Sequence, residues 1–461
     1  MRNIDRLTAE LASIAPSRRG GAVHAADGAS LTLNGLAPRA RLGDLIEVER
    51  RGGAPLGGEI IALRDGMAVA MTFAPAEGVG LGDCAWLSND PGLRPCDRWI
   101  GRMVDAFGRP LDGRPLQQGA DAIPLRRAAP PAAQRRSLGA RVATGVSALD
   151  TVLPIAKGQR IGLFAGSGVG KSTLLANLAK GVDADVVVLA LIGERGRELR
   201  EFAENALGVE GRKRAVIVAA TSDESPLVKR RAAWTALSVA EYFRDQGKQV
   251  LLLFDSLTRF AEAHREIALT AGEPPSLRAH PPSTAHLIAA LAERAGPGAD
   301  GPSGDITAVF TILVAGSDME EPIADMARGI LDGHVILDRE IAERGRFPAI
   351  DLRRSVSRVL PGVATPEENI MIAEARRLTA AYESALPMIQ AGLWKEGADS
   401  VADAAVRAHA TLDAFMAAPA PRGVPDSFAR LAQSLAPARI PGGGAGSSKN
   451  QGYSVTGGQR K

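Results

Sequence analysis

The residues best suited to chemistry lie in one glycine-rich segment that follows the apolar run 161–164. The segment reads Ala165, Gly166, Ser167, Gly168, Val169, Gly170, Lys171, Ser172 and Thr173. Glycines let successive backbone N–H groups turn toward phosphate, the lysine can reach the terminal phosphates, and the serine hydroxyl can bind Mg²⁺. Ala165 stands where such a loop usually begins with glycine, so its backbone must suit a methyl group. The spacing predicts a phosphate-binding loop in a nucleoside triphosphatase that uses Mg²⁺.

Two other apolar runs end at charged residues that fit the same chemistry. The run 250–254 ends at Asp255, where a carboxylate at a strand end can organise Mg²⁺ together with Ser172. The run 186–192 leads to Glu194 and Arg195. A carboxylate there could orient the attacking water, and a cation could hold the γ-phosphate. An aspartate that begins a loop and an exposed ion pair are the plainer alternatives, but the phosphate-binding loop favours the catalytic interpretation.

The elements that must position these residues alternate between strands and helices from 96 to 360, as an α/β fold with parallel strands requires. The candidate strands are 161–164, 186–192, 215–219, 250–254 and 309–314. Their almost continuous apolar character indicates strands that are covered on both faces. We expect the site at the carboxyl ends of these strands.

Residues 20–95 have a different pattern, in which short runs at 30–33, 45–49 and 67–71 are separated by glycine-containing turns. Such spacing predicts a small β-barrel. The segment before it, 1–19, carries one apolar face of a short helix that must dock on a partner, formed by Ile4, Leu7, Leu11 and Ile14.

The chain becomes helical after Pro361. Thr365, Pro366 and Glu368 have the arrangement of a capping box with proline at the first helical position, and alanine-rich helices are expected at 373–386 and 400–416. The last stretch is rich in glycine and lacks acidic residues, which is typical of a disordered tail. The predicted divisions are therefore a docking segment 1–19, a barrel 20–95, an ATPase domain 96–360, a helical domain 361–436 and a tail 437–461.

Composition excludes several classes of protein. No run approaches the roughly 18 to 20 apolar residues that span a bilayer, and the N-terminus lacks a secretory signal pattern, so we expect a cytoplasmic protein. The two cysteines are too few for a disulfide framework. A net charge of +3 does not require a nucleic-acid partner, and none is expected.

Four motifs in this order resemble the hexameric ATPases that energise type III protein export, which are relatives of the catalytic subunit of rotary ATP synthases. They occupy 193–198, 255–259, 272–275 and 322–325. The phosphate-binding loop is more similar to that of the flagellar export ATPase than to the injectisome form. The resemblance covers about 20–430 and implies a RecA-like P-loop ATPase core, an N-terminal β-barrel and a C-terminal helical domain.

The same resemblance implies roles for individual residues. Lys171 matches the phosphate-binding lysine, Glu194 the catalytic carboxylate and Asp255 the aspartate on the Mg²⁺ side. Arg195 and Arg259 match arginines on the γ-phosphate side.

Two further residues receive roles from the resemblance. Arg358 looks like the arginine finger, which enters the site of the neighbouring subunit, so a monomer should be a poor enzyme. Phe347 falls where the family often has a tyrosine against the adenine, and a phenylalanine keeps the stacking. A core aromatic is the plainer alternative for Phe347.

The implied partners are those of an export machine. The resemblance predicts a homohexamer, a stator-like regulatory protein on the N-terminal segment, and a coiled-coil stalk protein in the central channel near 272–275. Export substrates with their chaperones and the export gate at the membrane complete the set. The ring would then be peripherally associated with the inner-membrane export apparatus.

Three alternatives remain at this stage. An injectisome ATPase would keep the chemistry and change the apparatus served. A ring-shaped RNA translocase would need stacking aromatics, and 20–95 offer only Phe73 and Trp86 as large ones. A non-catalytic rotary subunit would bind nucleotide without turnover, but Glu194 and Arg195 beside a complete Lys171 and Ser172 pair argue against it.

Overall fold

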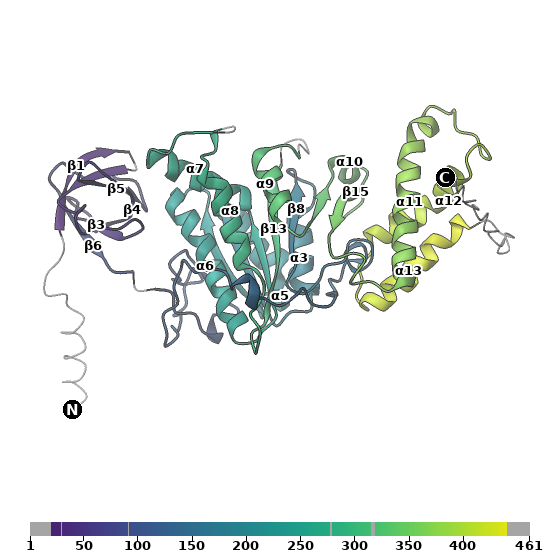
Figure 1. The fold of residues 1–461 in the computed structure, drawn as a ribbon, viewed down its shortest axis with the longest axis horizontal. Coiled ribbons are helices and arrows are strands. Elements are labelled where there is room, and N and C mark those ends of the chain that lie inside the picture. The colour runs from purple at the N-terminus through teal and green to yellow at the C-terminus, as the bar shows by residue number, and fades with distance from the viewer. Residues whose placement is uncertain (1–19, 29, 91, 277–278, 315–318, 440–461) are drawn as a thin grey trace, which may run out of the picture.

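The computed structural model describes residues 20–28, 30–90, 92–276, 279–314 and 319–439. Figure 1 shows a barrel, a layered α/β unit and a group of helices arranged in a row along the long axis. The predicted docking segment 1–19 and residues 440–461 of the predicted tail 437–461 lie outside the described residues. Within the described part of the chain, no helix is both long and apolar enough to cross a membrane.

The barrel is closed, with the strand order β1-β2-β5-β4-β3-β6. Its strands are β1 (Gly20–Asp27), β2 (Ser30–Asn34), β3 (Leu45–Val48), β4 (Leu56–Arg64), β5 (Met67–Thr72) and β6 (Cys84–Ser88). The sequence pattern predicted β2, β3 and β5 but missed the other three. Two of those contain glycine pairs, which weaken a strand signal. The glycines are needed because a Cβ at Gly21 would lie 2.2 Å from Asn34 O, and one at Gly58 would lie 2.5 Å from Met71 O.

The central unit is built on one sheet with the strand order β15-β14-β8-β13-β11-β9-β10-β7, and β12 pairs with β13. Neighbours from β14 to β7 are parallel, whereas β15 and β12 run antiparallel to their partners. All five predicted strands are present. The strands are β7 (Met103–Val104), β8 (Arg160–Ala165), β9 (Val186–Glu194), β10 (Ala215–Thr221), β11 (Val250–Asp255), β12 (Gly296–Pro297), β13 (Asp305–Leu313), β14 (Gly333–Leu337) and β15 (Ile350–Ser357).

Helices cover this sheet, so its strands are almost wholly buried. The long α6 is capped by the Ser225 side chain, has proline at its start, and packs on β9, β10 and β11. The helices of this unit are α2 (Ser147–Asp150), α3 (Lys171–Gly181), α4 (Gly196–Glu201), α5 (Gly208–Arg212), α6 (Pro226–Asp245), α7 (Leu257–Thr270), α8 (Ser283–Arg294), α9 (Pro322–Ile330) and α10 (Arg339–Glu343). A π-helical turn, Phe202–Ala206, joins α4 to α5.

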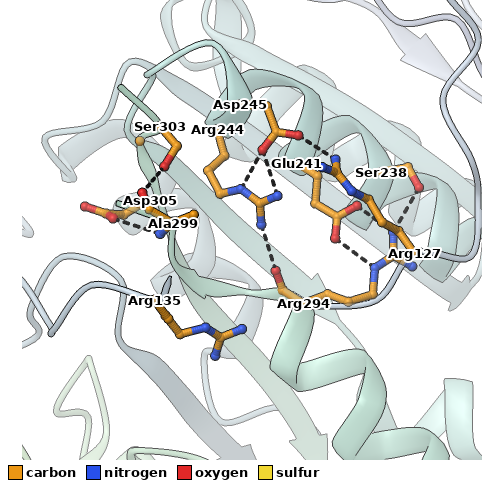
Figure 2. Close-up of polar contacts among 12 residues, drawn as sticks. Arg127, Arg135, Ser238, Glu241, Arg244, Asp245, Arg294, Ala299, Ser303 and Asp305 are labelled. Atoms are coloured by element: carbon orange, nitrogen blue, oxygen red, sulfur yellow. Dashed lines mark hydrogen bonds and ion pairs between the residues drawn. The ribbon is translucent and has the colours of Figure 1, made fainter. Parts of the chain in front are cut away.

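A buried ionic network ties α6 to α8 (Figure 2). Arg294 donates to both carboxylate oxygens of Glu241, at 2.9 and 2.8 Å, and to Ser238 Oγ at 3.0 Å. Arg244 in turn donates to the Arg294 carbonyl at 3.3 Å. Because Arg294 also donates to the Leu125 carbonyl at 3.0 Å, the network fixes the irregular connection that leads into the sheet.

The C-terminal unit consists of α11 (Pro366–Gln390), α12 (Ser400–Ala417) and α13 (Val424–Leu435), followed by a short 3₁₀ turn (Ala436–Ala438). The predicted capping box is present, since Thr365 accepts from the Glu368 N–H and Glu368 accepts from the Thr365 N–H. Helix α12 is capped by Asp399. Buried residues of α11, α12 and α13 join the core on one side of the central sheet, so this unit is continuous with the ATPase core.

Candidate active site

The predicted phosphate-binding loop connects the carboxyl end of β8 to the start of α3. Gly168 and Gly170 have φ values of 78° and 86°, which only glycine adopts readily, and α3 begins at Lys171. Ala165 is the last residue of β8 and is paired with Leu313 and Leu337 on the neighbouring strands. Its extended backbone tolerates a methyl group, so alanine does not disturb the loop.

Three predicted residues converge at this edge of the sheet. Lys171 Nζ lies 2.5 and 2.6 Å from the two carboxylate oxygens of Asp255, at the end of β11, and 3.5 Å from Glu194 Oε1, at the end of β9. The Asp255 side chain is only 5% exposed. Thr311 on β13 also donates to Asp255 Oδ1, at 2.6 Å. One lysine thus neutralises a buried carboxylate beside a second one.

Burial raises the pKa of Glu194, and the nearby Asp255 charge raises it further, whereas Lys171 lowers it. A carboxylate whose pKa lies above its ordinary value is better suited to accept a proton from water. Gly193, with a φ of 74°, precedes Glu194, and a Cβ there would lie 3.2 Å from the Arg259 side chain. This close approach sets Glu194 beside the start of α7.

The two predicted γ-phosphate arginines lie at the rim and not in the Lys171 cluster. Arg195 is 80% exposed and lies 3.2 Å from Glu198. Arg259, in the first turn of α7, lies 2.9 Å from Glu262. Each guanidinium is paired with a carboxylate three positions further along the chain, so contact with phosphate requires a change of rotamer.

A cavity of about 320 Å³ opens beside the cluster. Ser172, Thr173, Glu194 and Asp255 contribute oxygen atoms to its lining, and Leu199 and Phe202 form an apolar wall. Hydroxyl and carboxylate oxygens are the ligands that Mg²⁺ prefers, and Mg²⁺ usually keeps waters and substrate phosphates as its other ligands. The donor set therefore fits Mg²⁺ brought in with a nucleotide.

A second cavity, of about 410 Å³, lies on the other side of the loop. Its lining comes from four segments: residues 145–146, Gly170 with the face of α3 that carries Asn177, Phe347 with Pro348, and the connection 417–421 between α12 and α13. Phe347 is 47% exposed, and a Cβ at Gly170 would lie 2.9 Å from its ring. The core-aromatic alternative for Phe347 is therefore wrong, and its ring borders this open pocket.

Arg358 lies at the opposite end of the sheet from the loop. Leu337 at the end of β14 pairs with Ala165 and with Ile350, whereas Gly333 at its start pairs with Ser357. Because β15 is antiparallel, it carries Arg358 away from the phosphate-binding end. Its guanidinium donates to the carbonyls of Arg328 and Leu331, each at 3.0 Å.

Sequence reasoning missed the supporting residues of both pockets. Thr311 lies among apolar residues in a strand, and nothing in the surrounding sequence indicates its hydrogen bond to Asp255. The connection 417–421 comes from a helical region far along the chain, where its proline and alanine content suggests only a loop.

Comparison with known proteins agrees with this architecture. Residues 145–357 match the nucleotide-binding domain of the ATP synthase alpha/beta family, and 364–433 match the C-terminal domain of the type III secretion ATPase EscN. The flagellum-specific ATP synthase of Caulobacter vibrioides is 45% identical over 437 residues, which are 93% of this chain and 98% of that protein. The type 3 secretion system ATPase of Pseudomonas syringae pv. syringae is 40% identical over 82% of this chain and 85% of its own length.

Solved structures give the same result. The assembled ATPase EscN from the type III secretion system of enteropathogenic E. coli superimposes with a TM-score of 0.83 at 36% identity, covering 90% of this chain and all of that one. EscN in complex with its central stalk EscO gives a TM-score of 0.80 over the same share of both chains. The expected resemblance and fold class are confirmed, and the chain belongs to the family of flagellum-specific ATP synthases and type 3 secretion system ATPases.

Proposed function

We propose that this protein hydrolyses ATP with Mg²⁺ in a homohexameric ring and thereby energises flagellar type III protein export, including delivery and release of substrates and chaperones. The observation that carries the proposal is the convergence of Lys171, Glu194 and Asp255 beside a phosphate-binding loop. The likeness to flagellum-specific relatives over nearly their full length supports the flagellar assignment.

The position of Lys171 suggests how the site would hold ATP. Lys171 lies at the start of the helix that follows the phosphate-binding loop, and its Nζ contacts Asp255, from where it could reach the β- and γ-phosphates of ATP. Ser172 and Asp255 would hold Mg²⁺, which neutralises phosphate charge when bound. Glu194 would orient the attacking water, with Arg195 and Arg259 approaching the γ-phosphate from the rim.

Arg358 supports a ring in which each site is shared. It lies at the far end of β15 from its own phosphate-binding loop, which supports a role in the site of a different subunit. A guanidinium supplied from a neighbour would stabilise charge in the transition state. EscN, which matches this chain along its length, is described as an assembled ATPase.

Mixing two inactive variants tests the shared site. Glu194→Gln should abolish turnover and keep ATP binding, and Arg358→Ala should do the same. In equimolar mixed rings, about a quarter of the sites would combine an intact Glu194 with an intact Arg358, so activity should return to roughly that fraction of the unmodified level. If mixed rings stayed inactive while assembling normally, Arg358 would not act between subunits.

The remaining partners follow from the family. EscN binds a central stalk, EscO, and we propose that a coiled-coil stalk enters the channel of this ring near 272–275. We also propose a stator-like protein on segment 1–19 and an export gate at the inner membrane as contacts of the ring.

Loss of flagella in the native host on Lys171→Ala replacement, with injectisome secretion unaffected, would support the flagellar role. The reverse pattern would assign the injectisome.

The barrel offers little to a nucleic acid. Phe73 packs edge-on against Phe107, with ring centroids 5.0 Å apart, and Trp86 Nε1 donates to Glu49. Both aromatics are therefore engaged within the protein, which disfavours an RNA translocase. Stimulation of ATPase activity by single-stranded RNA would contradict this choice.

A further inference from the structure

The second cavity, beside Phe347, would hold the nucleobase under the proposed function, and we call it the nucleobase pocket. It is built partly by the C-terminal helical unit. One wall is Phe347 with Pro348, and another is the connection 417–421, which directly follows α12. The relative position of these two walls decides whether a base can stack on Phe347. A contact that joins the Phe347 segment to α12 would therefore set the width of the pocket.

Arg346 makes such a contact. Its Nη1 lies 3.2 Å from Asp413 Oδ1 on α12, and its Nη2 donates to the Ile350 carbonyl at 2.6 Å. The first contact crosses to the helical unit, and the second closes the turn that presents Phe347. One side chain thus links the turn to α12.

The surroundings of Arg346 show that this link is not an ordinary surface ion pair. The side chain is only 13% exposed, and its Nε is buried without a hydrogen-bond partner in the described structure. Burial lowers the pKa of Arg346, while the charge of Asp413 raises it. Burying a guanidinium with an incomplete set of partners costs free energy, which an exposed ion pair does not lose.

A second contact holds α11 and α12 together at the same place. The rings of Tyr382 and His409 stack with centroids 3.5 Å apart and planes 6° apart. Both residues line a small cavity that also includes Arg346 and Asp413. Because the two helices are braced to each other here, a displacement of either would carry Asp413 with it.

We propose that Arg346 is a positioning residue for the nucleobase, which holds Phe347 against α12 through Asp413 and so makes ATP binding depend on docking of the C-terminal helices. The proposal rests on the proposed function, since it concerns how the same site binds ATP. A partner that moved α11 and α12 would therefore change the affinity for ATP by altering the contacts with the base. The contacts with the phosphates would stay the same.

Asp413→Asn is the most direct test, because Asp413 is 44% exposed and the substitution nearly preserves its shape. Binding of ATP and of inorganic triphosphate is measured in the presence of Mg²⁺, together with steady-state kinetics. We expect the affinity for ATP to fall about tenfold, the affinity for triphosphate to stay unchanged, and kcat at saturating ATP to change less than about twofold. Arg346→Met should lower the affinity for ATP in the same way, and Arg346→Lys should keep part of the ATP affinity that Arg346→Met loses.

Two comparisons separate positioning from general structural damage. In a Phe347→Ala background, Asp413→Asn should cause no further loss of ATP affinity, since no ring remains to be positioned. Arg339→Met, which removes an exposed arginine from α10, is the matched control and should leave both affinities unchanged.

Equal weakening of ATP and triphosphate binding by Asp413→Asn would overturn the inference, as would an unchanged ATP affinity. Either result would leave the proposed function intact, because the unmodified protein would still bind and hydrolyse ATP. If the unmodified protein bound neither ligand, the proposed function would fail and this inference with it.

Discussion

Replacing Lys171 by methionine should destabilise the nucleotide-free protein as well as abolish ATP binding. Lys171 Nζ lies 2.5 and 2.6 Å from the carboxylate oxygens of the buried Asp255, and 3.5 Å from Glu194. Methionine keeps most of the aliphatic stem but leaves two carboxylates together without a cation. Loss of one partner from a buried ion pair costs about 3 to 5 kcal/mol. Because Thr311 still donates to Asp255, we expect a loss of about 3 kcal/mol, at the lower end of that range.

The loss should grow as the pH rises. Burial raises the pKa of Glu194 and Lys171 lowers it, so removing the lysine raises this pKa further. A carboxyl group with a higher pKa in the folded state favours folding below its unfolded pKa, and this contribution disappears as the pH rises through the folded value. The variant should therefore differ less from the unmodified protein near about pH 5 than near about pH 8.

Urea unfolding of the nucleotide-free protein at these two pH values measures the effect. Lys180→Met is the matched control, since Lys180 lies on the same helix, is exposed, and donates to the Ala206 carbonyl. We expect the control to lose at most about 1 kcal/mol at either pH. Equal stability of the Lys171 variant and the unmodified protein at pH 8, or a larger loss at pH 5, would refute the reasoning.

The remaining predictions concern the base pocket, the shared site and the buried network. Phe347→Ala should raise KM for ATP about tenfold in steady-state kinetics, whereas Phe347→Tyr should leave it nearly unchanged; equal effects would exclude stacking. Arg358→Ala should lower kcat by about 10³-fold or more with ATP binding retained, and a loss of binding instead would contradict a transition-state role. Glu241→Gln should lower the free energy of unfolding by about 3 to 5 kcal/mol because the buried charge of Arg294 loses its carboxylate partner. Arg339→Ala, which breaks an exposed pair, should cost less than about 1 kcal/mol in the same urea unfolding, and similar losses for both would contradict the role of burial.

Much of the site could be predicted from the sequence because its residues stand at the ends of strongly apolar strands. Lys171, Glu194 and Asp255 each follow such a run, and a parallel sheet brings the carboxyl ends of its strands to one edge. The capping box at Thr365 was likewise readable, since it depends on residues three positions apart. Local patterns of this kind are found in the folded protein as the sequence predicts them.

The barrel was harder to predict in detail. Strands β1 and β4 carry glycines where the neighbouring backbone approaches too closely for a Cβ, so the feature that lets them pair also weakens their strand signal. The pockets posed a different difficulty. Phe347 and the connection 417–421 are about 70 positions apart, and only packing of α12 on the core brings them together.

The order and direction of the strands could not be predicted from the spacing of residues in the sequence. Neighbours from β14 to β7 are parallel in this sheet, but β14 and β15 form an antiparallel pair, so β15 runs from the phosphate-binding end to the opposite end. Phe347 precedes this strand and Arg358 follows it, and the eight residues of β15 span about 25 Å. Under the proposed roles, one strand places the base-stacking Phe347 beside its own site and the finger Arg358 far from that site. This topology separates the two residues within one chain, and the proposed shared site would bring Arg358 to the nucleotide of a neighbouring subunit.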